Sequence, residues 1–136
     1  MPLHPRFVLD QGFDVYDHPQ GEERRGDETR ARAEAWLAER GEQRFFAFVH
    51  LFDPHTWYDA PLAERELFGA PRGPLPPYQM RIFLARPAAF AAELRADLLD
   101  AYDAEIRFAD AQLGALLAAL EARGLADSTL VVVTSD

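Results

Sequence analysis

The sequence contains no cysteine and no lysine, and no run of apolar residues approaches the length of a membrane-spanning helix. The missing cysteines exclude disulfides, thiolate catalysis and zinc–thiolate sites within these 136 residues. The formal net charge of −9 argues against nucleic acid or an anionic membrane surface as a partner. With 49% hydrophobic residues, the composition is that of a soluble globular protein.

The stretch from Phe45 to Phe52 is the strongest candidate for a buried strand. Seven of its eight residues are apolar, and the turn signal Asp53-Pro54 closes it. Strands that are buried on both faces belong to parallel sheets covered by helices. In such sheets ligands bind beyond the carboxyl ends of the strands. The polar residues at that end are His50, Asp53 and His55.

Three helices are predicted from apolar periodicity and capping residues. The first covers about 28–40, with Asp27 or Thr29 as its cap and Gly41 after it, and the second is a two-turn helix over Leu62–Phe68 that ends at Gly69. The third and longest covers about 89–123, and Gly124 followed by Leu125 forms its terminating motif. The apolar face expected for this helix comprises Leu98, Tyr102, Ile106, Ala109, Leu113, Leu116, Leu117 and Leu120.

A second buried strand is predicted at Thr129–Thr134, which is β-branched and apolar. Residues 1–27 are expected to be irregular, with a short strand near Phe7–Leu9, and residues 56–87 form a long irregular connection that borders the site.

Strand, long helix and strand together predict a right-handed βαβ unit. The fold class expected is therefore α/β, as a fragment of a doubly wound, mostly parallel sheet. The carboxyl ends of the two parallel strands would lie on one edge, which brings His50, Asp53 and His55 near Ser135 and Asp136. Because two strands do not make a stable sheet, we expect the chain to be part of a larger domain.

Three segments in order resemble the sulfatase family, which belongs to the alkaline phosphatase-like superfamily. The first is Arg44–Pro61, which reads RFFAFVHLFDPHTWYDAP. The second begins with YDAEIRFAD at Tyr102–Asp110 and Leu113-Gly114, and continues to TLVVVTSD at Thr129–Asp136. The third is LDQGFD at Leu9–Asp14, followed by Tyr16-Asp17. Trp57 departs from this pattern, since many members have proline before the tyrosine.

The resemblance implies a hydrolase of sulfate esters with a divalent cation, usually calcium, and a formylglycine made from cysteine or serine in a Cys/Ser-x-Pro-x-Arg motif. The chain contains no such motif. Residues 1–136 are therefore interpreted as a partial sulfatase catalytic domain that lacks the N-terminal nucleophile and metal part and a C-terminal part. We expect the fragment alone to be inactive.

Two residues receive functional roles from the resemblance. From the residues alone His55 is most simply a turn residue, but the family pattern makes it the catalytic residue that contacts sulfate and protonates the leaving alcohol. The pattern also makes Asp136 a metal ligand, a role that suits a carboxylate at a strand tip.

Other polar residues receive structural interpretations. His50 is expected to be a hydrogen-bonded structural histidine, and Asp53 a turn residue that accepts backbone amides. Tyr102, Glu105 and Asp110 are expected to pack or to form salt bridges, and the acidic residues near Glu23 to be solvated.

Two alternatives to a sulfatase stay open at this point. One is a phosphonate or phosphate-ester hydrolase of the same superfamily, because the nucleophile that would separate the two chemistries is not in the chain. The other is a non-catalytic remnant that acts as a binding or structural module.

Overall fold

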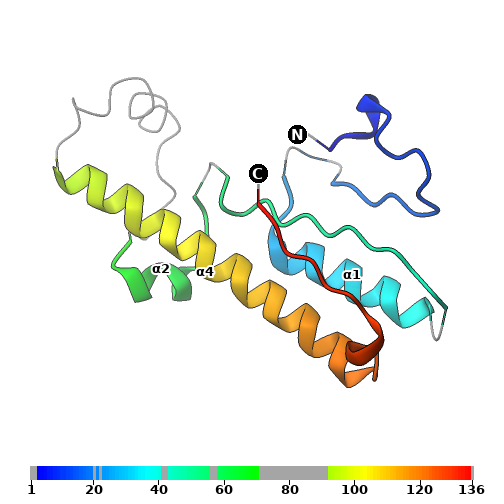
Figure 1. Cartoon of the computed structure of the whole chain (residues 1–136). Coiled ribbons are helices and arrows are strands. Elements are labelled where there is room, and N and C mark those ends of the chain that lie inside the picture. The colour runs from blue at the N-terminus through cyan, green and yellow to red at the C-terminus, as the bar shows by residue number, and fades with distance from the viewer. Residues whose placement is uncertain are drawn as a thin grey trace.

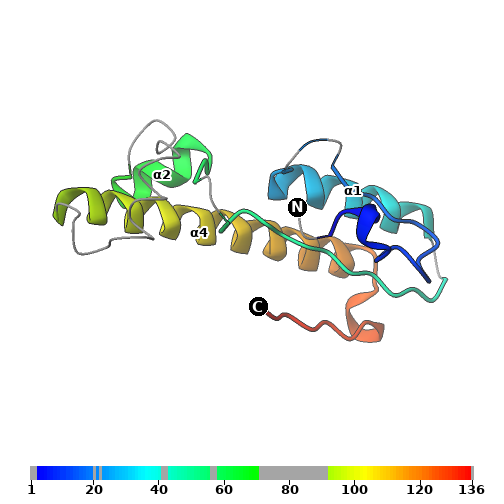
Figure 2. The same ribbon diagram turned by 90° about the horizontal axis from the view of Figure 1, so that it is seen from above.

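A computed structural model describes residues 3–19, 21, 23–40, 43–55, 58–70 and 92–135. Helix α4 is the long element on which the other two α-helices of this described part, α1 and α2, are packed (Figure 1). Seen from above, α1 and α2 lie along different parts of α4 (Figure 2). The elements in order are η1 (Pro5–Phe7), α1 (Gly26–Arg40), α2 (Leu62–Phe68), α4 (Ala92–Ala122) and η3 (Ala126–Ser128).

The helix ends lie where the sequence predicts them. α4 ends with Gly124 in the left-handed conformation, at a φ of 69°, and the amide of Leu125 donates to the carbonyl of Leu120 at 2.9 Å. α2 ends in the same way at Gly69, whose φ is 73°. The predicted helices at 28–40 and 62–68 are thus confirmed, and the third is confirmed from residue 92 onward. Its predicted start at 89–91 lies outside the described residues, as does most of the long connection after Ala70.

Small side chains on α4 form the centre of the core. Ala101 and Ala104 are 2% and 0% exposed, so other segments of the chain approach the α4 backbone closely. Ala104 packs with Phe108 and Ala60, and Ala101 packs with Leu98 and Ala70. The core is therefore a thin layer between α4 and the segments on either side of α2.

The buried face of α4 is only partly the face that periodicity predicts. Leu98 and Leu116 are buried as expected, whereas Tyr102, Ile106 and Leu117 are 38%, 43% and 40% exposed. The residues that are buried instead lie about one position earlier on the helix. They are Ala101, Ala104, Glu105, Phe108 and Gln112.

The predicted α/β fold with a parallel sheet is wrong for this structure, because no strand occurs in the described residues. The two apolar segments at 45–52 and 129–134 are open chain, and they lie apart in Figure 2. Among the described residues, neither segment forms a ladder of backbone hydrogen bonds. A strand exists only when a second strand accepts and donates those bonds, and here neither segment has that neighbour.

The short strand predicted near Phe7–Leu9 is also wrong. Pro5 starts a 3-10 helix that His4 caps, since its Nδ1 accepts the amide of Arg6 at 3.0 Å. Val8 then adopts a positive φ of 61° and ends the helix, which no strand conformation allows.

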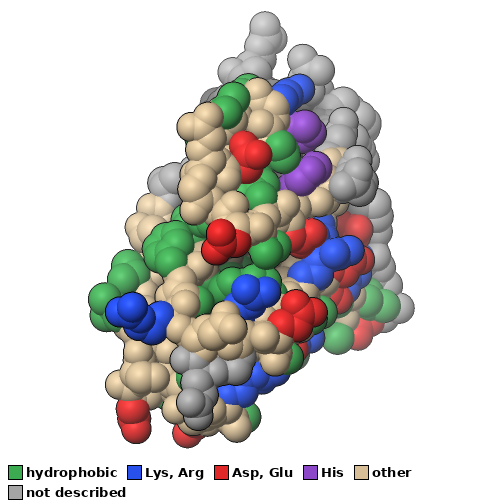
Figure 3. All heavy atoms as spheres, turned by 90° about the vertical axis from the view of Figure 1, so that its right-hand side faces the viewer, with side chains coloured by type: hydrophobic (Ala, Val, Ile, Leu, Met, Phe, Trp, Pro, Cys, Tyr) green, Lys and Arg blue, Asp and Glu red, His purple; other side chains and the backbone are tan. Residues whose placement is uncertain are grey.

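Apolar side chains in the two open segments remain exposed to solvent. Phe46 is 75% exposed and Val132 is 77% exposed. The view of one side of the molecule shows apolar side chains at the surface among arginines and carboxylates (Figure 3). Among the described residues, no helix is long and apolar enough to cross a membrane.

We expect Val132→Thr to leave the melting temperature nearly unchanged and to reduce aggregation, because the side chain is exposed and the segment offers unpaired backbone groups. Ala104→Leu is the contrasting variant, since it overpacks a fully buried position and should cost about 1–3 kcal/mol. Thermal unfolding and light scattering of the purified chain measure both effects. Equal losses of stability in the two variants would show that Val132 is packed.

Candidate functional site

His55 lies at the end of a tight turn that follows the 45–52 segment. Its amide donates to the carbonyl of Phe52 at 2.9 Å, and its ring stacks on the Phe52 ring with centroids 4.3 Å apart. The Nδ1 atom lies 3.4 Å from a carboxylate oxygen of Glu23, which makes an ion pair when the imidazole is protonated. The His55 side chain is 56% exposed. An exposed imidazole with a carboxylate behind it can transfer a proton to a bound molecule.

Asp53 fixes this turn to helix α1. Its Oδ1 accepts a hydrogen bond from the amide of Gly26, the first residue of α1, at 2.7 Å. A carboxylate at a helix N-terminus satisfies an amide that has no partner inside the helix, and it interacts favourably with the helix dipole. The prediction that Asp53 accepts backbone amides is confirmed, and one of the donors is a residue 27 positions away.

Glycine at position 26 permits this close approach. A Cβ atom at Gly26 would lie 2.7 Å from Oδ2 of Asp53, closer than such contacts occur in proteins. Oδ2 is itself buried and has no hydrogen-bond partner in the described part of the chain. Burial raises the pKa of Asp53 above its ordinary value of 3.8, although the hydrogen bond from Gly26 acts in the opposite direction.

A second buried carboxylate, Glu105 of α4, contacts the chain on the other side of His55. Its Oε1 accepts the amide of Ala60 at 2.5 Å, and the residue is only 3% exposed. Burial raises the pKa of Glu105 to about 7, against the effect of hydrogen bonds from the backbone of Ala60 and Asp59. Tyr58 beside it also has a raised pKa, because burial and the nearby Tyr102 and Glu105 disfavour the phenolate.

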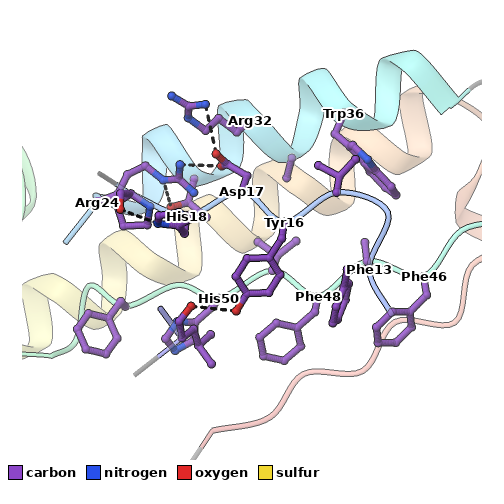
Figure 4. Close-up of a pocket in the computed structure, with 18 residues that line it drawn as sticks. Phe13, Tyr16, Asp17, His18, Arg24, Arg32, Trp36, Phe46, Phe48 and His50 are labelled. Atoms are coloured by element: carbon purple, nitrogen blue, oxygen red, sulfur yellow. Dashed lines mark hydrogen bonds and ion pairs between the residues drawn. The ribbon is translucent and has the colours of Figure 1, made fainter. Parts of the chain in front are cut away.

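A cavity of about 200 Å³ borders the site, enclosed by residues of the N-terminal segment, α1 and 46–52. Figure 4 shows two kinds of wall: the Arg24–Asp17–Arg32 ion pairs lie at one end. Phe13, Trp36, Phe46 and Phe48 lie at the other end. Phe52 lines this cavity and stacks on His55, so the cavity and the His55 turn are adjacent.

The structure brings together some of the residues that the sequence predicts at one edge. His50 is half-buried in the cavity wall, with its ring 5.3 Å from that of Phe52, and is therefore near the His55 turn. Asp136, the predicted metal ligand, and Trp57 lie outside the described residues.

Metal binding finds no ready site in the described part of the chain. Within it, no group of three or more His, Asp or Glu side chains is arranged to hold a metal ion. The residues present there thus do not fit a divalent cation by themselves.

Two carboxylates at the site are missed by the sequence analysis. Glu23 is expected there to be solvated, but it is next to His55. Glu105 is expected to pack or to form a salt bridge, and among the described residues it contacts backbone amides and forms no ion pair. A signal for Glu105 exists in the sequence, since it is four residues after Ala101 and three before Phe108, on their helix face.

The sulfatase family model matches residues 10–136, and the chain belongs to this family. The match includes all three segments that carry the resemblance, apart from Leu9 at its edge. Comparisons with curated proteins and with solved structures give no match.

We expect Gly26→Ala to destabilise the protein by about 1–2 kcal/mol, because its Cβ would displace Asp53 and remove the hydrogen bond to α1. Gly114→Ala is the matched control, since a Cβ there meets nothing within 4 Å. In the interior of α4 that change should be neutral or stabilising. Denaturant titration measures both variants, and a neutral Gly26→Ala would contradict the close approach.

Glu105 should make folding stability depend on pH near neutrality. Its pKa is raised in the folded state, so its contribution is fully present below about pH 4.5 and is lost as pH rises to about 7. Glu105→Gln cannot ionise, and the free energy of unfolding should then fall by roughly 1–3 kcal/mol less over this range. Urea titrations between pH 4.5 and 8 measure the slope. Asp103→Asn, an exposed change on the same helix, should keep the wild-type slope.

Proposed function

We propose that this chain supplies the leaving-group side of the active site of a sulfuric ester hydrolase, with His55 as the general acid. The observation that carries the proposal is the arrangement of His55 itself. Its imidazole is exposed, stacks on Phe52, and has the carboxylate of Glu23 at 3.4 Å from Nδ1. Membership of the sulfatase family supports the choice of sulfate esters as substrates.

The chemistry explains why an acid is needed at this position. Attack at sulfur breaks the S–O bond, and the bonding electrons leave with the ester oxygen as an alkoxide. An imidazolium at that oxygen transfers its proton as the bond lengthens, so that a neutral alcohol departs. Glu23 would stabilise the imidazolium before transfer and would hold the ring in one orientation.

In this proposal residues 1–136 form part of a sulfatase catalytic domain. In the family a formylglycine supplies the nucleophile and a divalent cation, usually calcium, binds at the sulfate. Asp136 remains a proposed ligand of such a cation, and no role in nucleophilic attack is assigned to any residue described here. The apolar cavity beside Phe52 offers room next to His55 for the alcohol part of an ester.

We expect His55→Ala to slow hydrolysis of alkyl sulfates by about 10²–10⁴-fold, the usual effect of losing a general acid. Nitrophenyl sulfates should lose distinctly less, because a nitrophenolate leaves without a proton. The measurement is kcat/KM for both substrate classes in the protein produced from its native gene.

His50→Gln is the control, because His50 lies in the cavity wall behind Phe52 and is not assigned to the proton transfer. It should lower stability and leave the ratio of the two rates unchanged. Equal losses for the two leaving groups in His55→Ala would rule out the acid role. Faster hydrolysis of phosphate or phosphonate esters than of any sulfate would contradict the proposed substrate class.

A further inference from the structure

Glu105 holds the backbone of a neighbouring segment from a buried position on α4. Its carboxylate accepts the Ala60 amide at 2.5 Å, and Ala60 is itself only 1% exposed. The backbone of Asp59 also donates to it. Hydrogen bonds from amides to a carboxylate are stronger than those between neutral groups, and they fix the path of the main chain. Glu105 therefore determines where residues 59–60 lie on α4.

The same stretch of chain is fixed at its other end by Asp53. That carboxylate accepts the amide of Gly26 at 2.7 Å, across 27 residues of sequence. Helices α1 and α4 are packed against each other, so the two anchors belong to one framework. His55 lies between them, and the chain around it runs from the start of α1 towards α4 and α2 (Figure 1).

We propose that Glu105 is a positioning residue for His55. By holding residues 59–60 on α4 while Asp53 holds the turn on α1, it limits the movement of the segment that carries the imidazole. This inference rests on the proposed function, because the position of His55 matters to the reaction only if His55 acts on the substrate. Glu105 itself is not proposed to touch the substrate.

The charge of Glu105 should affect how firmly it holds the segment. The groups that face it are Tyr58 and Asp59 of the segment and Asp53 of the turn, and Tyr102 of α4 lies next to Tyr58. Arg65 of α2 balances part of this negative charge through its ion pair with Asp59 at 3.3 Å. Since the pKa of Glu105 is about 7, its hydrogen bond to Ala60 should be strongest in mildly alkaline solution, where the carboxylate is ionised.

Hydrogen exchange followed by mass spectrometry at pH 8 tests the inference in the protein produced from its native gene. In Glu105→Ala, amides in a peptide covering 50–61 should exchange about tenfold faster, as expected for the loss of a hydrogen bond to a charged group. Peptides from the body of α1 should exchange at the wild-type rate. Glu105→Gln keeps an oxygen acceptor and should restore much of the protection, and Asp103→Asn, exposed on the same helix, should change nothing.

Two results would overturn the positioning role. One is unchanged exchange at 50–61 in Glu105→Ala, and the other is equal acceleration in 50–61 and in α1, which is general destabilisation. Kinetics then separate this inference from the proposed function. If the segment loosens as expected, Glu105→Ala should slow alkyl sulfates more than nitrophenyl sulfates, and Glu105→Gln should recover the ratio. Local loosening with equal losses for both leaving groups would contradict the acid role of His55 and leave the anchoring by Glu105 intact.

Discussion

Close packing on one face of α4 is the constraint on which the rest of the structure depends. Ala101 and Ala104 remove side-chain volume from that face, so the main chain near Ala60 and Ala70 can reach the helix. Contact at this distance excludes water from the groups between them. A carboxylate at position 105 is then buried and must find its partners in the approaching backbone.

Two buried carboxylates convert this packing into a defined position for the His55 turn. Asp53 caps α1 across 27 residues of sequence, and Glu105 of α4 holds Ala60. Both have a raised pKa because burial disfavours their charge, and in both cases backbone amides offset part of that cost. The region around the candidate acid is thus held by polar contacts with main-chain atoms, whereas the core beneath it is small and apolar.

The apolar segments at 45–52 and 129–134 obey a different constraint. Their side chains favour burial, yet Phe46 and Val132 are largely exposed and the backbone forms no ladder within the described residues. An extended chain gains little from its own neighbours in sequence, because its hydrogen bonds are all made to another strand. The composition of these segments therefore expresses a preference that this structure does not satisfy.

The sequence by itself determined the local features of this protein and its family. Gly69 and Gly124 end helices because a left-handed residue is needed there, and such a requirement can be recognised within a few residues. The motifs that resemble sulfatases likewise depend only on residue order, and the family match confirms them. Only the tertiary structure decided which face of α4 is buried, that Gly26 partners Asp53, and that Glu23 lies beside His55. It also decided that no strand forms in the described chain, because strands, burial and remote hydrogen bonds all require a partner whose position no local pattern encodes.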